Sequence, residues 1–370
     1  MTVRGAVLNA VLITRPDPEF SYTDRALGPS SFDAVSGRRC VVTGGLGFIG
    51  ANLALALAES GADVTVIDAQ VARHGANPWN LVPDGDEAAR RGEVDDRIAV
   101  VEADIGDTDR PDVREATVSA DVVFNLAGQV SHVDSMDDPL FDLDVNTTSQ
   151  FRYLELLRRE NPSATVVFTS TRQIFGKPRY LPVDEDHPVA PVDVNGITKY
   201  ATEQLHLLYH DVYGLRSTAV RLTNVFGPRQ RLRDDLQGFL PIFVRRALAN
   251  DAITVFGDGE QQRDCLYVDD VVECLLLAAT ANDAPGQIFN VGNDERLSLG
   301  AIAHAVVAAA GQGRVDYVPW PPDRDAIDIG SYFGDSSKAK RVLGWEPRTA
   351  FADGIARTLA FYRARAAWYL

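Results

Sequence analysis

Apolar and polar positions alternate in blocks along most of the chain, and these blocks predict strands and helices in turn. Short apolar or β-branched runs typical of buried strands cover residues 40–42, 64–67, 98–102, 121–126, 165–170 and 217–222. Segments rich in helix formers lie between several of these runs and include residues 51–60, 141–160 and 196–213. Strands separated by helices favour a parallel sheet with right-handed crossovers. The pattern therefore predicts an α/β protein with a doubly wound parallel sheet.

The second half of the chain has a different pattern. Its predicted elements are helices at 239–248, 268–280 and 299–310, short strands at 253–256 and 288–291, and a proline-rich loop at 319–325. We expect a smaller C-terminal α/β lobe over the carboxyl edge of the sheet, where open α/β sheets bind ligands. The predicted organisation is an arm at 1–37, a first domain at 38–225, and a substrate lobe at 226–370 with some segments returning to the first domain.

A glycine-rich turn joins the first predicted strand to the first predicted helix. Residues 43–50 read TGGLGFIG. In such a turn we expect Gly45 to allow the sharp bend, Gly47 to admit a pyrophosphate, and Gly50 to let helix and strand pack closely. The helix N-terminus offers free N–H groups and a partial positive charge to phosphates. The turn predicts a dinucleotide site on a Rossmann domain, and the alternative is a turn that only connects two elements.

An acidic residue, Asp68, closes the second predicted strand. It lies about twenty residues after the glycine turn, where a carboxylate accepts hydrogen bonds from the adenosine ribose. The same carboxylate would repel a 2′-phosphate. The sequence therefore predicts NAD rather than NADP as the cofactor.

Composition narrows the remaining functions. The 370 residues carry a net charge of -16, and no basic stripe is present, so we expect no nucleic-acid partner. Three cysteines without C-x-x-C spacing favour free thiols in a reducing, cytoplasmic compartment. No apolar run approaches the length of a membrane span, and the N-terminal apolar stretch lacks a signal-peptide cleavage site. We expect neither a membrane partner nor a metal.

Several longer motifs share a resemblance. They read TGGLGFIG, NLAGQVS, FTSTRQIFG, RLTNVFGPRQ and VFGDGEQQRDCLYVDDVV. Over residues 38–363 the chain resembles the extended short-chain dehydrogenase/reductase family, of the nucleotide-sugar epimerase and dehydratase type typified by UDP-glucose 4-epimerase. The resemblance implies an NAD-dependent enzyme acting on a nucleotide-diphosphate sugar. It also implies a homodimer that pairs the helices at 142–159 and 196–213.

The resemblance assigns roles residue by residue. The residues implied in holding the cofactor are Gly44, Gly47, Phe48, Ile49, Gly50, Asp68, Asp104, Ile105, Leu126, Ala127, Gly128, Gln129 and Lys199. Thr171 takes the place of the catalytic hydroxyl, and the implied substrate residues are Asn224, Arg229 and Arg263. Simpler roles stay open: Asp104 as a turn residue, Asn224 as a loop cap, Arg229 as a solvated loop residue, and His132 as a structural polar residue.

One position departs from the family pattern. The family has a Tyr-x-x-x-Lys pair in which lysine and oxidised nicotinamide lower the pKa of the catalytic tyrosine. Here the segment reads Asn195-Gly196-Ile197-Thr198-Lys199, so an amide without useful basicity replaces the tyrosine. Asn195 either caps the helix or orients a substrate hydroxyl, and both roles are compatible. Substitutes for the proton-transfer group are Lys199, Thr171 with a water, Tyr180, His132 and His187.

A second departure concerns the reaction. Sugar-nucleotide 4,6-dehydratases carry Asp and Glu after the catalytic hydroxyl, whereas Thr171 is followed by Arg172 and Gln173. This difference disfavours a standard 4,6-dehydratase. The sequence predicts a nucleotide-sugar epimerase with transient oxidation of a sugar hydroxyl and an atypical proton-transfer group. The alternatives are a dehydratase or oxidoreductase of the same family and a catalytically silent NAD-binding protein.

Overall fold

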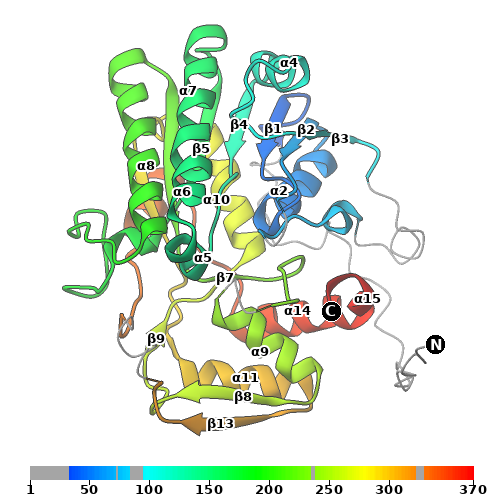
Figure 1. Cartoon of the computed structure of the whole chain (residues 1–370), viewed down its shortest axis with the longest axis vertical. Helices are drawn as coiled ribbons and strands as arrows, with labels where there is room; N and C mark the ends of the chain where they lie inside the picture. Colours follow the sequence, from blue (N-terminus) through cyan, green and yellow to red (C-terminus); the bar gives the residue numbers. More distant parts are fainter. Residues whose placement is uncertain (1–32, 72–73, 84–94, 235–237, 322–328) are drawn as a thin grey trace.

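The computed structural model describes residues 33–71, 74–83, 95–234, 238–321 and 329–370, so residues 1–32 of the predicted arm lie outside it. A seven-stranded parallel sheet forms the larger part, in the order β11-β6-β5-β4-β1-β2-β3 (Figure 1). Its strands are β1 (Arg39–Thr43), β2 (Asp63–Asp68), β3 (Ile98–Glu102), β4 (Val122–Asn125), β5 (Thr165–Thr171), β6 (Arg216–Leu222) and β11 (Ile288–Val291). This sheet confirms the predicted Rossmann-like α/β fold.

Helices cover both faces of this sheet. They are α2 (Phe48–Glu59) and α10 (Val268–Thr280) on one face, and α4 (Pro111–Ser119), α7 (Ser149–Glu160) and α8 (Val194–Tyr213) on the other. Every position of β4 is buried, as is typical of a strand covered on both faces. Short elements complete this part: η2 (Pro78–Leu81), α5 (His132–Asp137), α6 (Pro139–Leu143), the π-helical turn η3 (Asp144–Thr148) and η4 (Arg172–Phe175).

A smaller lobe lies beyond the carboxyl ends of the strands (Figure 1). Its strands β8 (Ala252–Phe256) and β13 (Arg314–Val318) pair in parallel, and they pack with α9 (Phe239–Leu248), α11 (Leu299–Ala310) and α14 (Phe351–Ala364) around a separate apolar core. Two two-stranded pairs, β7 (Val225–Phe226) with β10 (Leu266–Tyr267) and β9 (Gln262–Arg263) with β12 (Leu297–Ser298), lie between the parts. The chain ends with α13 (Ser337–Leu343) and α15 (Ala366–Tyr369).

Segments after residue 226 return to the larger part of the protein. β11 pairs with β6 along Ala219–Leu222, and α10 packs beside α2. The domain boundary at residue 225 stays a prediction. Within the described residues, the helices are all too short or too polar to cross a membrane.

Candidate active site

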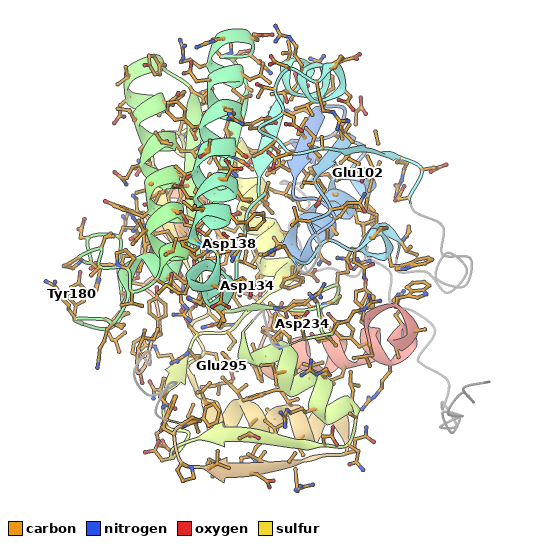
Figure 2. The ribbon with its side chains drawn as sticks, in the orientation of Figure 1. Glu102, Asp134, Asp138, Tyr180, Asp234 and Glu295 are labelled. Atoms are coloured by element: carbon orange, nitrogen blue, oxygen red, sulfur yellow. The ribbon has the colours of Figure 1, made fainter. Side chains whose placement is uncertain are left out.

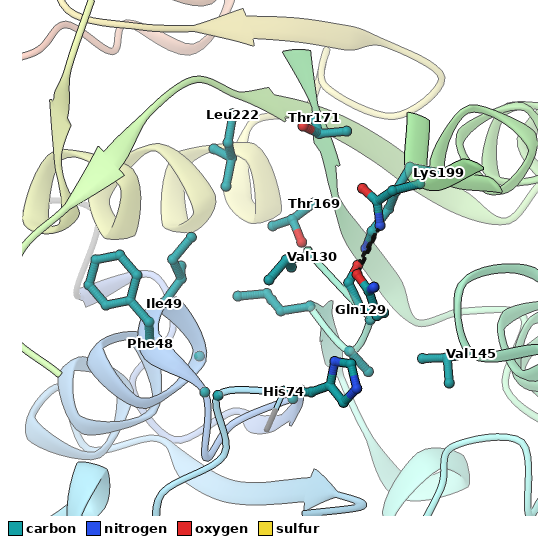
Figure 3. Close-up of a pocket in the computed structure, with 18 of the residues that line it drawn as sticks. Phe48, Ile49, His74, Gln129, Val130, Val145, Thr169, Thr171, Lys199 and Leu222 are labelled. Carbon is teal, nitrogen blue, oxygen red and sulfur yellow. Dashed lines mark hydrogen bonds between the residues drawn. The ribbon is translucent and has the colours of Figure 1, made fainter. Parts of the chain in front are cut away.

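A pocket of about 400 Å³ lies at the carboxyl ends of the sheet strands, where the smaller lobe meets the sheet. It is lined by residues that follow β1, β2, β3, β4, β5 and β6, together with the N-terminal parts of α8 and α9. Figure 3 shows Phe48 and Ile49 on one side of this pocket and Thr169, Thr171 and Lys199 on another. Parallel strands bring their carboxyl ends to one edge, so side chains distant in sequence meet here.

The glycine turn encloses one end of the pocket. Gly44 has a φ of 67°, and a Cβ atom on Gly50 would lie 2.3 Å from the carbonyl oxygen of Gly44. Both positions therefore require glycine. The expectation for Gly45 was wrong, because Gly44 makes the sharp bend while a Cβ on Gly45 would meet the side chain of Val66 at 2.5 Å.

Two carboxylates line the same end of the pocket. Asp68 is buried, and its two oxygens accept hydrogen bonds from the backbone N–H groups of Leu46 and Gln70, each at 2.9 Å. Burial raises the pKa of Asp68, and these two hydrogen bonds oppose that shift. Asp104 accepts a hydrogen bond from Gly106 N at 2.6 Å, as a turn residue does. Each carboxylate oxygen keeps a second lone pair that can accept a ligand hydroxyl.

The floor of the pocket is held by buried hydrogen bonds. Thr43 Oγ1 accepts from the backbone N–H groups of Leu126 and Ala127, at 3.1 and 3.0 Å, and donates to Asn125 Oδ1 at 2.8 Å. Gln150 Nε2 in turn donates to the carbonyl oxygen of Ala127 at 2.8 Å. These contacts fix the segment after β4 against the sheet edge.

Lys199 lies beneath this segment. It is buried, and a Cβ atom added to Gly128 would lie 2.4 Å from its Nζ, so the close approach requires glycine. Burial lowers the pKa of Lys199 to about 8, although the charge of Asp142 opposes the shift. Burial and the charge of Lys199 lower the pKa of the neighbouring His206 to about 3. The pocket therefore contains a cationic side chain whose proton is held less firmly than usual.

Asn195 lies one helical turn before Lys199 and also lines the pocket. Its Nδ2 donates to the carbonyl oxygen of Gln129 at 2.9 Å and to Asp142 Oδ2 at 3.1 Å. The helix-cap interpretation was wrong, because α8 begins at Val194 and the carboxylate of Asp193 caps it by accepting from Gly196 N at 2.7 Å.

Thr171 ends β5 and lines the pocket. Its Oγ1 accepts a hydrogen bond from Gln173 N at 3.2 Å. The side chain of Gln173 in turn contacts the imidazole of His132, which contacts the carboxylate of Asp193. The same strand end brings in Arg172, whose Nη2 donates to Asn224 Oδ1 at 3.3 Å. Asp193 does not line the pocket, whereas the other residues of this group do: Thr171, Arg172, Gln173, His132 and Asn224.

The structure brings together only part of the predicted substrate set. Asn224 lines the pocket, and its Nδ2 is buried without a hydrogen-bond partner among the described residues. Arg229 lies outside the residues that line the pocket, and its guanidinium donates to the carbonyl oxygens of Asn80 and Val82. Arg263 also lies outside, and its Nη1 donates to the carbonyl oxygens of Gln262 and Gly330.

Two of the suggested substitutes for the missing base lie elsewhere. Tyr180 donates to Asp184 at the outer edge of the loop between β5 and α8, and that hydrogen bond raises its pKa to about 12 (Figure 2). His187 is buried, accepts from Arg179 N at 2.9 Å, and contacts the carbonyl oxygen of Pro188. Neither residue lines the pocket.

Sequence reasoning missed two contributors to the site. The family pattern shows only that Arg172 is not an acid, and it assigns no role to Asp193. The predicted helix begins at residue 196, whereas α8 begins at Val194, so the cap signal of Asp193 lies two residues too early for the predicted start. Nothing in the sequence shows that this cap lies against His132, 61 residues earlier.

A parallel sheet with a glycine turn, a strand-end carboxylate and a buried lysine around one pocket defines a dinucleotide-dependent enzyme of the Rossmann class. Residues 40–292 match the model of the NAD dependent epimerase/dehydratase family. The chain is 34% identical over 325 residues to UDP-glucose 4-epimerase of Mycolicibacterium smegmatis, covering 88% of this chain and 98% of the relative. It is 30% identical over 338 residues to dTDP-glucose 4,6-dehydratase of Streptomyces niveus, covering 90% and 94%.

Solved structures agree with this result. The crystal structure of UDP-glucose 4-epimerase from Thermotoga maritima with UDP-glucose superposes with a TM-score of 0.75 at 28% identity, covering 88% of this chain and 99% of that one. The chain belongs to the NAD dependent epimerase/dehydratase family. It is an NAD-dependent sugar-nucleotide enzyme of that family.

The residues present fit the cofactor. Gly44 and Gly50 leave no room for side chains where a pyrophosphate approaches the N-terminus of α2, and Asp68 offers free lone pairs nearby. Gly128 keeps the ammonium group of Lys199 close to the pocket floor. Among the described parts of the chain, no cluster of three or more His, Cys, Asp or Glu side chains is suited to a metal ion.

Proposed function

We propose that the protein is a nucleotide-sugar epimerase that transiently oxidises a sugar hydroxyl, with an atypical proton-transfer group. The observation that supports this proposal is a pocket lined by the glycine turn, Asp68 and Lys199, to which Asn195, four residues before Lys199, also contributes. When bound, NAD accepts and returns a hydride at the reacting carbon. An amide cannot move the accompanying proton near neutral pH, so another residue of the pocket has to do so.

We assign the roles of the chain as follows. Asp68 accepts hydrogen bonds from the adenosine ribose, and the N-terminus of α2 holds the pyrophosphate. Lys199 binds the nicotinamide ribose, and the hydroxyl of Thr171 hydrogen-bonds the reacting oxygen. Asn224 anchors the nucleotide sugar through its unpartnered amide nitrogen, since a buried polar group without a partner is costly unless a ligand satisfies it.

We also propose a homodimer formed through α7 and α8. The two helices lie side by side on one face of the sheet (Figure 1), and their exposed large apolar side chains are Phe151, Ile197, Leu208, Val212 and Tyr213. Exposed apolar residues grouped on adjacent helices favour an interface. Light scattering should give twice the chain mass at micromolar concentration, and Leu208→Glu combined with Val212→Glu should give monomers. A wild-type monomer would contradict the proposal.

The test of the function is incubation with NAD and a panel of UDP- and dTDP-linked sugars, followed by chromatography and mass spectrometry. A product of unchanged mass and altered retention supports epimerisation. A product lighter by one water identifies a dehydratase instead. No product from any sugar, with NAD bound, favours the catalytically silent alternative.

A further inference from the structure

The pocket contains a histidine–carboxylate pair that no role assigned so far uses. His132 begins α5 directly after the segment that follows β4, and its side chain lines the pocket. Its Nδ1 contacts Asp193 Oδ2, and its Nε2 contacts the side-chain amide nitrogen of Gln173. A carboxylate only accepts hydrogen bonds and an amide nitrogen only donates them. With the Gln173 amide in this orientation, Nδ1 donates to Asp193 and the lone pair of Nε2 accepts from the amide.

We propose that His132, oriented by Asp193, takes and returns the proton of the substrate hydroxyl in this enzyme. The inference rests on the proposed function, because a proton-transfer group is needed only if the sugar hydroxyl is oxidised. A carboxylate that holds Nδ1–H of a histidine and leaves Nε2 as the base is an arrangement used for proton transfer on unrelated folds. Here the pair connects through Gln173 to Thr171, the predicted partner of the reacting oxygen.

Asp193 is suited to this orienting role. It is buried, which alone would raise its pKa, yet hydrogen bonds from His132 and Gly196 and the charge of Arg172 hold its pKa below the ordinary value. Asp193 therefore stays ionised and stabilises an imidazolium that forms beside it. Arg172, which directly follows β5, also interacts electrostatically with Asp193.

The side chain of Gln173 adds a second indication. Its Oε1 is buried without a hydrogen-bond partner among the described residues, while its nitrogen lies against His132. A substrate hydroxyl that displaces this amide from Nε2 can donate its proton to the imidazole. The unpartnered oxygen shows that the present orientation of the Gln173 amide leaves one of its hydrogen bonds unmade.

The transfer balances with the proposed reaction. The O–H bond of the sugar breaks, and its proton goes to Nε2 of His132. The C–H bond at the same carbon breaks, its electron pair leaves with the hydrogen to oxidised NAD, and a C=O bond forms. Return of the hydride to the other face and of the proton to the oxygen regenerates the free enzyme.

Lys199 is the alternative base, but its position favours cofactor binding. Its Nζ lies against Gly128 and close to Asn146 in the buried floor, whereas His132 is exposed at the pocket. Thr171 has a hydroxyl that is not basic near neutral pH, so it acts as a hydrogen-bonding partner. His132 combines an orienting carboxylate with an imidazole that is exposed at the pocket.

The test uses the full-length protein with NAD and the sugar nucleotide that the panel identifies. His132→Gln should lower kcat by about 10²- to 10⁴-fold, the usual contribution of a general base. NAD affinity and melting temperature should stay close to those of the wild type. His132→Ala should regain part of the lost rate when imidazole is added. The matched control is His304→Gln, an exposed histidine on α11 in the other lobe, which should keep full activity.

Asp193→Asn separates orientation from helix capping. Asn caps a helix as well as Asp does, so α8 should stay intact and the melting temperature should change little. The kcat should fall while the NAD affinity stays unchanged, because the imidazole loses the carboxylate that orients it. A readout independent of turnover is ¹⁵N NMR of histidine-labelled protein, in which the signal absent from His132→Gln should report Nδ1–H in the wild type.

Full activity of His132→Gln, with the panel reaction intact in the wild type, would overturn the inference and leave the proposed function standing. A proton on Nε2 rather than Nδ1 in the NMR spectrum would also overturn it. If no sugar nucleotide reacts with the wild type, the proposed function fails and the inference fails with it.

Discussion

The side-chain amide of Asn195 donates a hydrogen bond to the carboxylate of Asp142, which is wholly buried between α6 and α8. The other oxygen of Asp142 accepts from the hydroxyl of Thr198, and the ammonium charge of Lys199 is close enough to interact with it. A buried carboxylate needs donors on both oxygens. The residue at position 195 is therefore part of the network that supplies hydrogen-bond donors to Asp142 beneath the active site.

This relationship predicts a coupled loss of stability. Asn195→Ala should lower the free energy of unfolding by about 1–3 kcal/mol, because it removes a donor from a buried charged acceptor. In a double-mutant cycle with Asp142→Ala, urea denaturation should give a coupling energy of roughly 0.5–3 kcal/mol. Additive effects of the two substitutions would show that the hydrogen bond contributes nothing.

The same network predicts that the family tyrosine will not restore the usual mechanism. Asn195→Tyr places a larger phenol beside Asp142 and removes the amide that donates to it, so the carboxylate loses one partner. We expect a lower melting temperature and no gain in turnover, with NAD still bound. A rise in turnover would identify the protein as a weakened member of the tyrosine mechanism and would contradict the role given to His132.

The pKa of Lys199 predicts a pH dependence of stability. It is about 8 in the folded protein against an ordinary value of 10.5, so the unfolded chain binds more protons between these values. Stability should therefore rise with pH from about 8 to about 10.5 on account of this group, and the cost of the buried charge is fully present below pH 8. In cofactor-free protein, Lys199→Met should have a larger free energy of unfolding than the wild type at pH 8. This difference should become smaller as the pH rises toward 10.5.

The measurement is urea denaturation of both proteins at several pH values from 7 to 10. Tyrosine and cysteine groups titrate in the same range, so the useful quantity is the difference between variant and wild type. The matched control is Lys177→Met, an exposed lysine after η4, whose difference from the wild type should not change with pH. If the difference in free energy of unfolding between Lys199→Met and the wild type does not change with pH, the prediction of a buried ammonium group is contradicted.

Much of this fold follows from local pattern. Buried parallel strands are nearly continuous apolar runs, so β4 and β5 are recognisable without a partner strand. The position of β11 in the sheet could not be predicted in this way. Its four residues pair with β6, which lies some 70 residues earlier in the chain, and only the assembled sheet shows that β11 forms its edge. Local pattern identifies elements, whereas long-range pairing determines which sheet they join.

The site divides in the same way. The glycine turn, Asp68 and Lys199 are recognisable because their chemistry depends on spacing within one strand–turn–helix unit or one helix. The roles of arginine residues cannot be recognised in this way, because their long side chains can reach in many directions. Arg263 and Arg229 belong to segments that resemble substrate loops, yet their guanidinium groups donate to backbone carbonyls outside the lining of the pocket.

Cofactor choice is the next prediction. Asp68→Ala should weaken NAD binding by about 1–3 kcal/mol, the cost of removing a hydrogen bond to a charged group, and should narrow the preference for NAD over NADP. Asp63→Ala is the matched control, because Asp63 is the exposed first residue of the same strand. Isothermal titration of both cofactors measures the effect. Equal or tighter binding of NADP by the wild type would count against the assignment.

The last prediction concerns which arginine meets the negative charge of the substrate. Arg172 lines the pocket, donates to Asn224, and lies over the ring of Tyr332 with its guanidinium carbon 4.9 Å from the ring centroid. Arg263, which the family resemblance favours, is buried outside the lining and donates to two carbonyl oxygens.

Because a guanidinium at the pocket can reach a ligand without rearrangement, Arg172→Ala should weaken binding of the nucleotide sugar by roughly 10- to 100-fold. Arg263→Ala should instead lower the melting temperature, since it removes the hydrogen bonds that the buried guanidinium donates to the carbonyl oxygens of Gln262 and Gly330. Titration calorimetry with UDP and with the intact nucleotide sugar separates the two parts of the ligand: a loss confined to the intact sugar places Arg172 at the sugar, and a loss with UDP places it at the phosphates. If Arg263→Ala loses affinity while Arg172→Ala keeps it in a folded protein, the family assignment is right and the contacts of Arg263 change when substrate binds.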